Sequence, residues 1–138
     1  MSDISVVIPT FNRRRILAEV LAALEAQQAA PPFEIVVVDD GSTDGTFEWL
    51  QQRPPLGPQS PLRPLRPLRP LCPLRVLRQD NRGPAAARNR GVAESAGVLV
   101  AFLGDDTVPE PGWLAAHWAV HQEARDGALL AAIGYTAW

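Results

Sequence analysis

The chain has 138 residues and a mass of 15.0 kDa, and 46% of its residues are hydrophobic, which fits one globular domain and excludes disorder throughout. The formal net charge is −2, so the chain lacks the excess of basic residues that nucleic-acid-binding proteins have, and we expect no nucleic-acid partner. All 13 basic residues are arginine, which excludes a P-loop and a Schiff-base mechanism because both require lysine. The single cysteine, Cys72, excludes an internal disulfide and a cysteine zinc site.

Two further features of the sequence bear on where in the cell the protein is found. Uninterrupted apolar runs, such as residues 98–103 and 35–38, are far shorter than the ~20 residues of a membrane span, so none is expected. The N-terminus also lacks the basic stretch that opens a signal peptide. Together with the lone cysteine, these features predict a cytoplasmic protein.

The first half of the chain alternates between strand and helix patterns. Residues 4–8 are apolar apart from Ser5 and end at Pro9, which is typical of a strand buried on both faces. Asn12 is a candidate cap for a helix whose apolar residues recur at helical spacing over 16–24. A second β-branched run, 34–38, stops at Asp39 and is followed by a short predicted helix around residues 47–50.

The second half repeats this alternation. Residues 74–77 predict a third strand, Pro84 opens a helix, and residues 98–103 predict a fourth buried strand. A helix over 113–123 and a fifth strand over 129–135 follow. The whole chain, 1–138, therefore predicts a single α/β domain with a parallel, Rossmann-like sheet and helices on both of its faces.

The segment 53–73 does not fit this alternation. It holds eight of the 14 prolines, and Pro-Leu-x units repeat from residue 61 to residue 75. A period of three matches the polyproline II helix, so we expect an exposed, low-complexity insertion. The simpler interpretation is a tolerated repeat expansion, and the alternative is a docking peptide, since residues 64–67 read PxxP.

Acidic pairs follow two of the predicted strands. Asp39 and Asp40 come after the run 34–38, and Asp105 and Asp106 come after the run 98–103. Because the carboxyl ends of parallel strands share one edge, we expect both pairs in one crevice, where like charges need compensation. Mg²⁺ or Mn²⁺ is commonly held by one or two carboxylates plus substrate phosphates. We therefore expect a divalent metal that bridges a diphosphate, and Asp39 or Asp40 free to accept a hydrogen bond from a base or a ribose.

Four motifs occur in an order and spacing that point to a known family. They are SVVIPTFN at 5–12, VDDGSTDGT at 38–46, NRG with ARNRG at 81–91, and FLGDD with a following proline at 102–109. In this respect the chain resembles glycosyltransferase family 2. The resemblance implies the GT-A fold, a nucleotide-diphosphate sugar donor, a divalent metal and inversion at the anomeric carbon.

The resemblance also assigns roles to residues. Nucleotide-sugar binding falls to residues after the strands and on the helix that begins at Pro84, namely Pro9, Thr10, Phe11, Asn12, Asp39, Asp40, Arg88, Asn89 and Asp105. In this set Pro9, Thr10 and Phe11 line the base pocket, Asp40 contacts the base with Asp39 beside it, and Arg88 offers positive charge to the diphosphate. Asp106 holds the metal, together with Asp105, which lies towards the ribose. Gly104 stands where the family's acidic triplet has its first acid.

The resemblance covers the donor-binding part of the family. Inverting transfer needs a base that deprotonates the acceptor, and we expect it downstream of Trp138, since Glu110 and Glu123 do not match its position. The chain is thus expected to be the nucleotide-binding half of such an enzyme, either truncated or a short gene product. We expect it to be inactive alone and open to homo-oligomer formation along an exposed sheet edge. The alternative is a non-catalytic nucleotide-sugar-binding or interaction module that recruits a partner through the proline-rich segment.

Two smaller groups carry open alternatives. His117 and His121 share a helix face and either form half of a metal site or, as we favour, pack with Trp113 and Trp118. The run Arg13-Arg14-Arg15 either steers a phosphate or is a solvated helix end.

Overall fold

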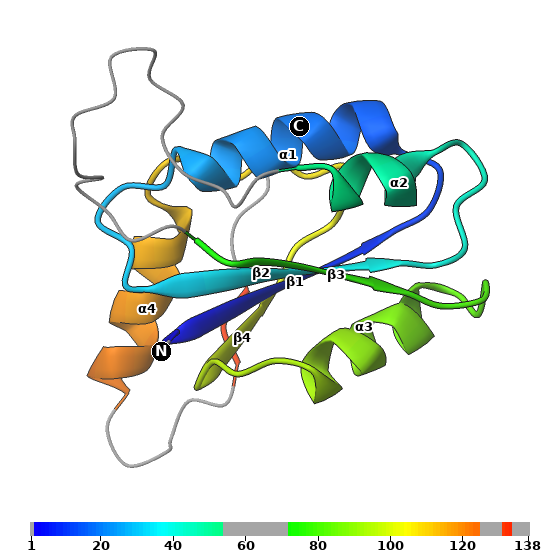
Figure 1. Cartoon of the computed structure of the whole chain (residues 1–138). Coiled ribbons are helices and arrows are strands. Elements are labelled where there is room, and N and C mark those ends of the chain that lie inside the picture. Colours follow the sequence, from blue (N-terminus) through cyan, green and yellow to red (C-terminus); the bar gives the residue numbers. More distant parts are fainter. Residues whose placement is uncertain (1, 54–71, 125–130, 134–138) are drawn as a thin grey trace.

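A computed structural model describes residues 2–53, 72–124 and 131–133. Strands and helices alternate along these residues (Figure 1). The strands are β1 (Ile4–Thr10), β2 (Phe33–Asp39), β3 (Leu74–Arg78) and β4 (Leu99–Phe102). The helices are α1 (Arg14–Glu25), α2 (Thr46–Gln51), α3 (Pro84–Ala93) and α4 (Trp113–Glu123).

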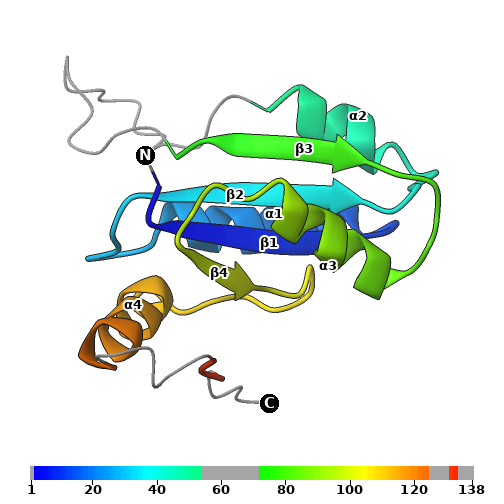
Figure 2. The same ribbon diagram turned by 90° about the horizontal axis from the view of Figure 1, so that it is seen from below.

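The strands form one parallel sheet in the order β3-β2-β1-β4. Helices α1 and α2 cover one face and α3 covers the other, while α4 lies beside β4 (Figures 1 and 2). The predicted parallel sheet with helices on both faces is therefore confirmed. The register sets Thr10 beside Asp39 and Asp39 beside Arg78, so the carboxyl ends of the strands line one edge of the sheet, on the right in Figure 1.

The two central strands supply the core. Every residue of β1 is buried, and alternate side chains point to opposite faces, as strand geometry requires. On one face the apolar residues of β1 and β2 pack against the buried stripe of α1, which consists of Leu17, Val20, Leu21 and Leu24. On the other face Val7, Val36 and Val38 pack against Ala87 of α3. This burial of apolar surface is the main force that stabilises the layers.

Helix α3 lies unusually close to the sheet. A Cβ atom added to Gly91 would come within 2.3 Å of Val7 Cγ1, so a larger residue there would force the helix away from β1. Pro84 occupies the first turn of α3, where its missing N–H breaks no helical hydrogen bond. This close packing fixes the N-terminus of α3 beside the carboxyl end of β2.

Two local expectations were wrong. Residues 98–103 do not form a strand buried on both faces, because β4 covers only Leu99–Phe102 and is the last strand in the described sheet. Val98 is 87% exposed and Phe102 is 51% exposed, and an apolar run alone does not distinguish an edge strand from a central one. Asn12 does not cap α1: its φ is 51°, Arg13 holds the N-cap position, and the Asn12 Oδ1 accepts a hydrogen bond from the Thr43 backbone N–H (2.8 Å).

The remaining expectations concern the chain ends and the insertion. Residues 131–133 form no strand, and the rest of the expected strand 129–135 lies outside the described residues. So does the proline-rich segment, apart from Arg53, Cys72 and Pro73. None of the helices in the described ranges has the length and apolar character needed to cross a membrane.

Candidate functional site

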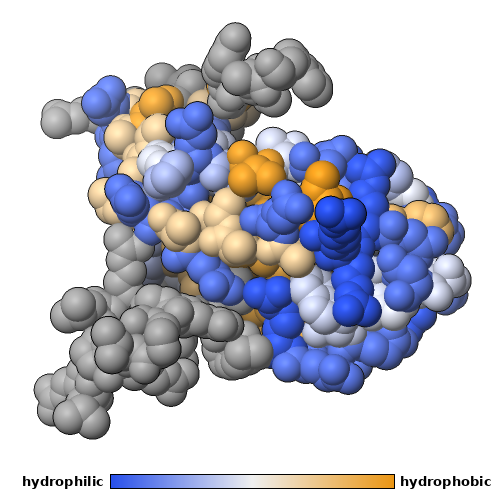
Figure 3. Space-filling view, turned by 90° about the horizontal axis from the view of Figure 1, so that it is seen from above, coloured by the Kyte–Doolittle hydropathy of each residue, from blue (hydrophilic) through white to orange (hydrophobic). Residues whose placement is uncertain are grey.

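The loops at the carboxyl edge of the sheet carry most of the predicted site residues. Strands β2 and β4 flank β1, so the two acidic pairs that follow them lie at the same edge of the molecule. The surface at this end is mostly hydrophilic, whereas apolar residues show over the middle of the helical face (Figure 3). The edge therefore has the polar character that a charged ligand requires.

Asp40 is almost fully buried and fastens the loop between β3 and α3. Its Oδ1 accepts hydrogen bonds from Gln79 Nε2 (2.8 Å) and the Arg82 backbone N–H (2.9 Å), and its Oδ2 accepts one from the Gly83 backbone N–H (2.9 Å). Burial is the largest influence on the pKa of Asp40 and raises it, but the hydrogen bonds from Arg82, Gln79 and Gly83 together outweigh it and lower the pKa. Asp40 thus remains charged and sets where α3 begins.

Asp39 is completely buried and only partly satisfied. Its Oδ2 accepts a hydrogen bond from the Ser42 backbone N–H (3.2 Å) and lies 3.7 Å from Arg78 Nε. Arg78 in turn lies over the Phe47 ring, 4.9 Å from its centroid. Asp39 Oδ1 has no hydrogen-bond partner among the described residues. A buried carboxylate oxygen without a donor is unusual and indicates a place for a further donor.

The second acidic pair is tied to the loop after β1. Thr10 Oγ1 donates a hydrogen bond to Asp105 Oδ2 (3.0 Å). Arg13 Nη1 lies 3.4 Å from Asp105 Oδ1 and 2.7 Å from Asp106 Oδ2. Burial raises the pKa of Asp105, and this outweighs the lowering by the Thr10 hydroxyl and Arg13. The two carboxylates therefore point at one position, which a guanidinium nitrogen fills.

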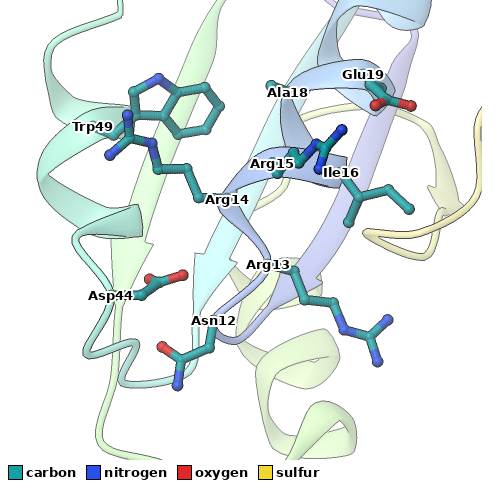
Figure 4. Close-up of a pocket in the computed structure, with 9 residues that line it drawn as sticks. All are labelled: Asn12, Arg13, Arg14, Arg15, Ile16, Ala18, Glu19, Asp44 and Trp49. Atoms are coloured by element: carbon teal, nitrogen blue, oxygen red, sulfur yellow. The ribbon is translucent and has the colours of Figure 1, made fainter.

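The three consecutive arginines diverge. Figure 4 shows Arg14 reaching towards Trp49, whereas Arg13 points away from both. The Arg14 guanidinium carbon lies 5.9 Å from the centre of the Trp49 ring. Arg15 forms no ion pair within the described part of the chain. Arg13 alone of the three contacts the acidic pair.

Gly104 gives Asp106 its space. A Cβ atom at position 104 would lie 2.9 Å from Asp106 Oδ1 and 3.1 Å from Thr107 Oγ1. Any side chain there would force the Asp106 carboxylate to move. Glycine at position 104, where the family's triplet has an acid, thus leaves the space that the Asp106 carboxylate occupies.

The donor set suits a hard divalent cation. Within residues 2–53, 72–124 and 131–133 no group of three or more His, Cys, Asp or Glu side chains converges. Two carboxylates nevertheless reach one guanidinium nitrogen. Two carboxylate ligands, with the remaining positions left to phosphate and water, match the usual coordination of Mg²⁺. Asp105 and Asp106 therefore fit the predicted metal.

The remaining residues predicted to bind the nucleotide-sugar fall into a buried group and an exposed group. Pro9 and Thr10 are buried and shape the edge, whereas Phe11, Asn12, Arg88 and Asn89 are exposed. Arg88 and Asn89 lie on α3, and neither contacts the acidic pairs through a described hydrogen bond or ion pair. Sequence reasoning missed Gln79 and Arg78, although both stand at the end of β3, where the same strand-end argument applies.

The two histidines of α4 and Cys72 are less suited to metal binding or catalysis than the acidic pairs. Trp113 and His117 pack edge to face with ring centroids 5.2 Å apart, and burial followed by the nearby His121 lowers the pKa of His117. Burial raises the pKa of the Cys72 thiol to about 12, so it is a poor nucleophile.

Comparison with known proteins also points to a glycosyltransferase. Residues 5–137 match the family described as Glycosyl transferase family 2. Glycosyltransferase AglE of Haloferax volcanii is 30% identical over 112 residues, which are 80% of this chain and 33% of AglE.

Solved structures share the fold. The crystal structure of residues 1–349 of S. aureus TarS in complex with UDP-GlcNAc superposes with a TM-score of 0.68 at 28% identity, over 89% of this chain and 32% of that TarS fragment. A mannosyltransferase from Pyrobaculum calidifontis, in complex with GDP-Man and Mn²⁺, gives a TM-score of 0.59 at 26% identity, over 79% of this chain and 29% of that enzyme. The sheet is therefore of the GT-A type. The chain spans about a third of AglE, of the TarS fragment and of the mannosyltransferase. It belongs to glycosyltransferase family 2.

Proposed function

We propose that the chain binds a nucleotide-diphosphate sugar together with Mg²⁺ or Mn²⁺ and presents it for inverting glycosyl transfer. The observation that carries the proposal is the convergence of Asp105 and Asp106 on one cation position at the carboxyl edge of the sheet. The UDP-GlcNAc complex of TarS and the GDP-Man and Mn²⁺ complex of the mannosyltransferase support the same class of ligand.

The nucleoside end of the donor belongs on the β1–β2 side of the edge. Phe11 and Asn12 are exposed there and provide an aromatic face and an amide, while buried Pro9 and Thr10 hold their loop in place. Of the two carboxylates after β2, Asp39 is the better acceptor, since its Oδ1 has no protein donor in the described chain and Asp40 already accepts three hydrogen bonds. This contact requires the side chains that cover Asp39 to move when the nucleoside binds.

The diphosphate end belongs beside the second acidic pair. A metal held by Asp106 and Asp105 would offset negative charge on the leaving diphosphate. Positive charge for the diphosphate comes from Arg82, in the loop before α3, and from Arg88, on α3, which are exposed and form no ion pair among the described residues. Arginine has to supply this positive charge because the chain contains no lysine.

The acceptor half of the reaction belongs to another part of the enzyme. Glu110 and Glu123 are exposed and lie in the segment around α4, not among the edge loops described above. The matched relatives extend well beyond the third that this chain spans, and we assign the base that deprotonates the acceptor to that uncovered part.

Calorimetry with UDP or GDP, with and without Mn²⁺, tests the donor site. We expect Mn²⁺ to strengthen nucleotide binding, and Asp106→Ala to abolish this strengthening. Asp80→Ala is the matched control, because Asp80 is exposed and forms no ion pair in the described chain. Equal affinities with and without metal in the unaltered chain would refute the metal assignment.

A further inference from the structure

Arg13 holds both carboxylates of the proposed metal site with a single nitrogen. Its Nη1 lies 2.7 Å from Asp106 Oδ2 and 3.4 Å from Asp105 Oδ1. A divalent cation bound by the same two side chains would compete for the same space and charge. We propose, on the basis of the function above, that Arg13 is an internal counter-cation that occupies the metal position in the ligand-free chain and yields it to the metal.

The ion pair has the properties of a replaceable contact. The side chains of Arg13 and Asp106 are 51% and 53% exposed, and ion pairs this open to water contribute little to stability. Asp105 is less exposed, but its contact with Arg13 is the longer one and Thr10 holds it independently. Arg13 precedes α1 and has no other acidic partner within the described chain, so its side chain can swing away without breaking the fold.

This arrangement couples metal entry to donor binding. Mn²⁺ alone must displace the guanidinium and then remain close to its positive charge, which opposes binding. A bound diphosphate adds negative charge that satisfies both cations, so metal and nucleotide favour each other more strongly with Arg13 present. Because coupling between two ligands is reciprocal, it appears equally in the affinity for either one.

Titration of Mn²⁺ followed by electron paramagnetic resonance of the free ion tests the proposal. We expect Arg13→Gln to bind Mn²⁺ alone about three- to tenfold more tightly than the unaltered chain, from the strength of exposed ion pairs and the removed repulsion. Addition of UDP or GDP, corrected for Mn²⁺ held by free nucleotide, should then strengthen Mn²⁺ binding less in Arg13→Gln than in the unaltered chain.

Two variants control for charge and folding. Arg15→Gln removes the same charge from the neighbouring turn, where Arg15 has no described ion pair, and should bind Mn²⁺ like the unaltered chain. Arg13→Lys keeps the charge and should leave Mn²⁺ binding weak. Circular dichroism should show the same fold for all three.

The outcomes separate this proposal from the proposed function. If Arg13→Gln binds Mn²⁺ no more tightly than Arg15→Gln, the counter-cation proposal is wrong, even where Mn²⁺ still strengthens nucleotide binding through Asp106. If neither the unaltered chain nor Arg13→Gln binds Mn²⁺ with or without nucleotide, both proposals are wrong.

Discussion

Asp40 and Asp106, the second residues of the two acidic pairs at the edge of the sheet, have opposite surroundings. Asp40 is buried and held largely by backbone N–H groups, which have no alternative position. Asp106 is half exposed and held by one long side chain, which can leave. A carboxylate at a strand end is therefore structural where fixed backbone donors satisfy it, and available to a ligand where a movable cationic side chain does.

The largest effect on stability is expected when Asp40 is removed. Asp40→Ala should lower the free energy of unfolding by about 3 kcal/mol, because the backbone N–H groups of Arg82 and Gly83 lose a charged, almost fully buried acceptor. Chemical denaturation monitored by circular dichroism measures this value. A loss below about 1 kcal/mol would contradict a structural role for Asp40.

The pH dependence of stability tests the same assignment. The pKa of Asp40 is lowered from 3.8 in the folded chain, so its contribution is complete above that value and disappears as the pH falls through the lower folded pKa. Asp40→Asn should therefore be less stable than the unaltered chain near neutral pH, and the difference should shrink below about pH 4. A difference that stays constant down to pH 2 in denaturation experiments would contradict this prediction.

The smallest effect is expected at the other pair. Asp106→Asn should change the free energy of unfolding by less than about 0.5 kcal/mol, because its ion pair with Arg13 is exposed. The same denaturation experiment measures it beside Asp40→Ala. A loss as large as that of Asp40→Ala would show that Asp106 also has a structural role.

The sequence predicted the sheet well because its signals are local. The strand patterns at 4–8, 34–38 and 74–77 mark strands, and Pro84 marks the start of α3, in agreement with the structure. The acidic pairs could be placed at one edge because parallel strands all end on the same side. Pattern and topology were sufficient for these features.

Other features depend on contacts between distant parts of the chain. Arg13 meets Asp106 across 93 positions, and Asp40 meets the loop at 79–83 across about 40, so neither pairing leaves a periodic signal. Glu34 was expected only as part of a strand, yet it is buried and accepts hydrogen bonds from Ser5 Oγ (2.6 Å) and the Ala96 backbone N–H (2.8 Å). Exposure of Phe102 likewise depends on which strands lie beside β4.

The most direct test is a crystal structure of the chain grown with Mn²⁺ and UDP or GDP, with anomalous scattering used to locate the metal. We expect one Mn²⁺ peak in contact with Asp106, the diphosphate beside that ion, and Arg13 withdrawn from both carboxylates. A diphosphate bound elsewhere on the molecule, or Arg13 still bridging Asp105 and Asp106 with nucleotide and metal bound, would contradict it.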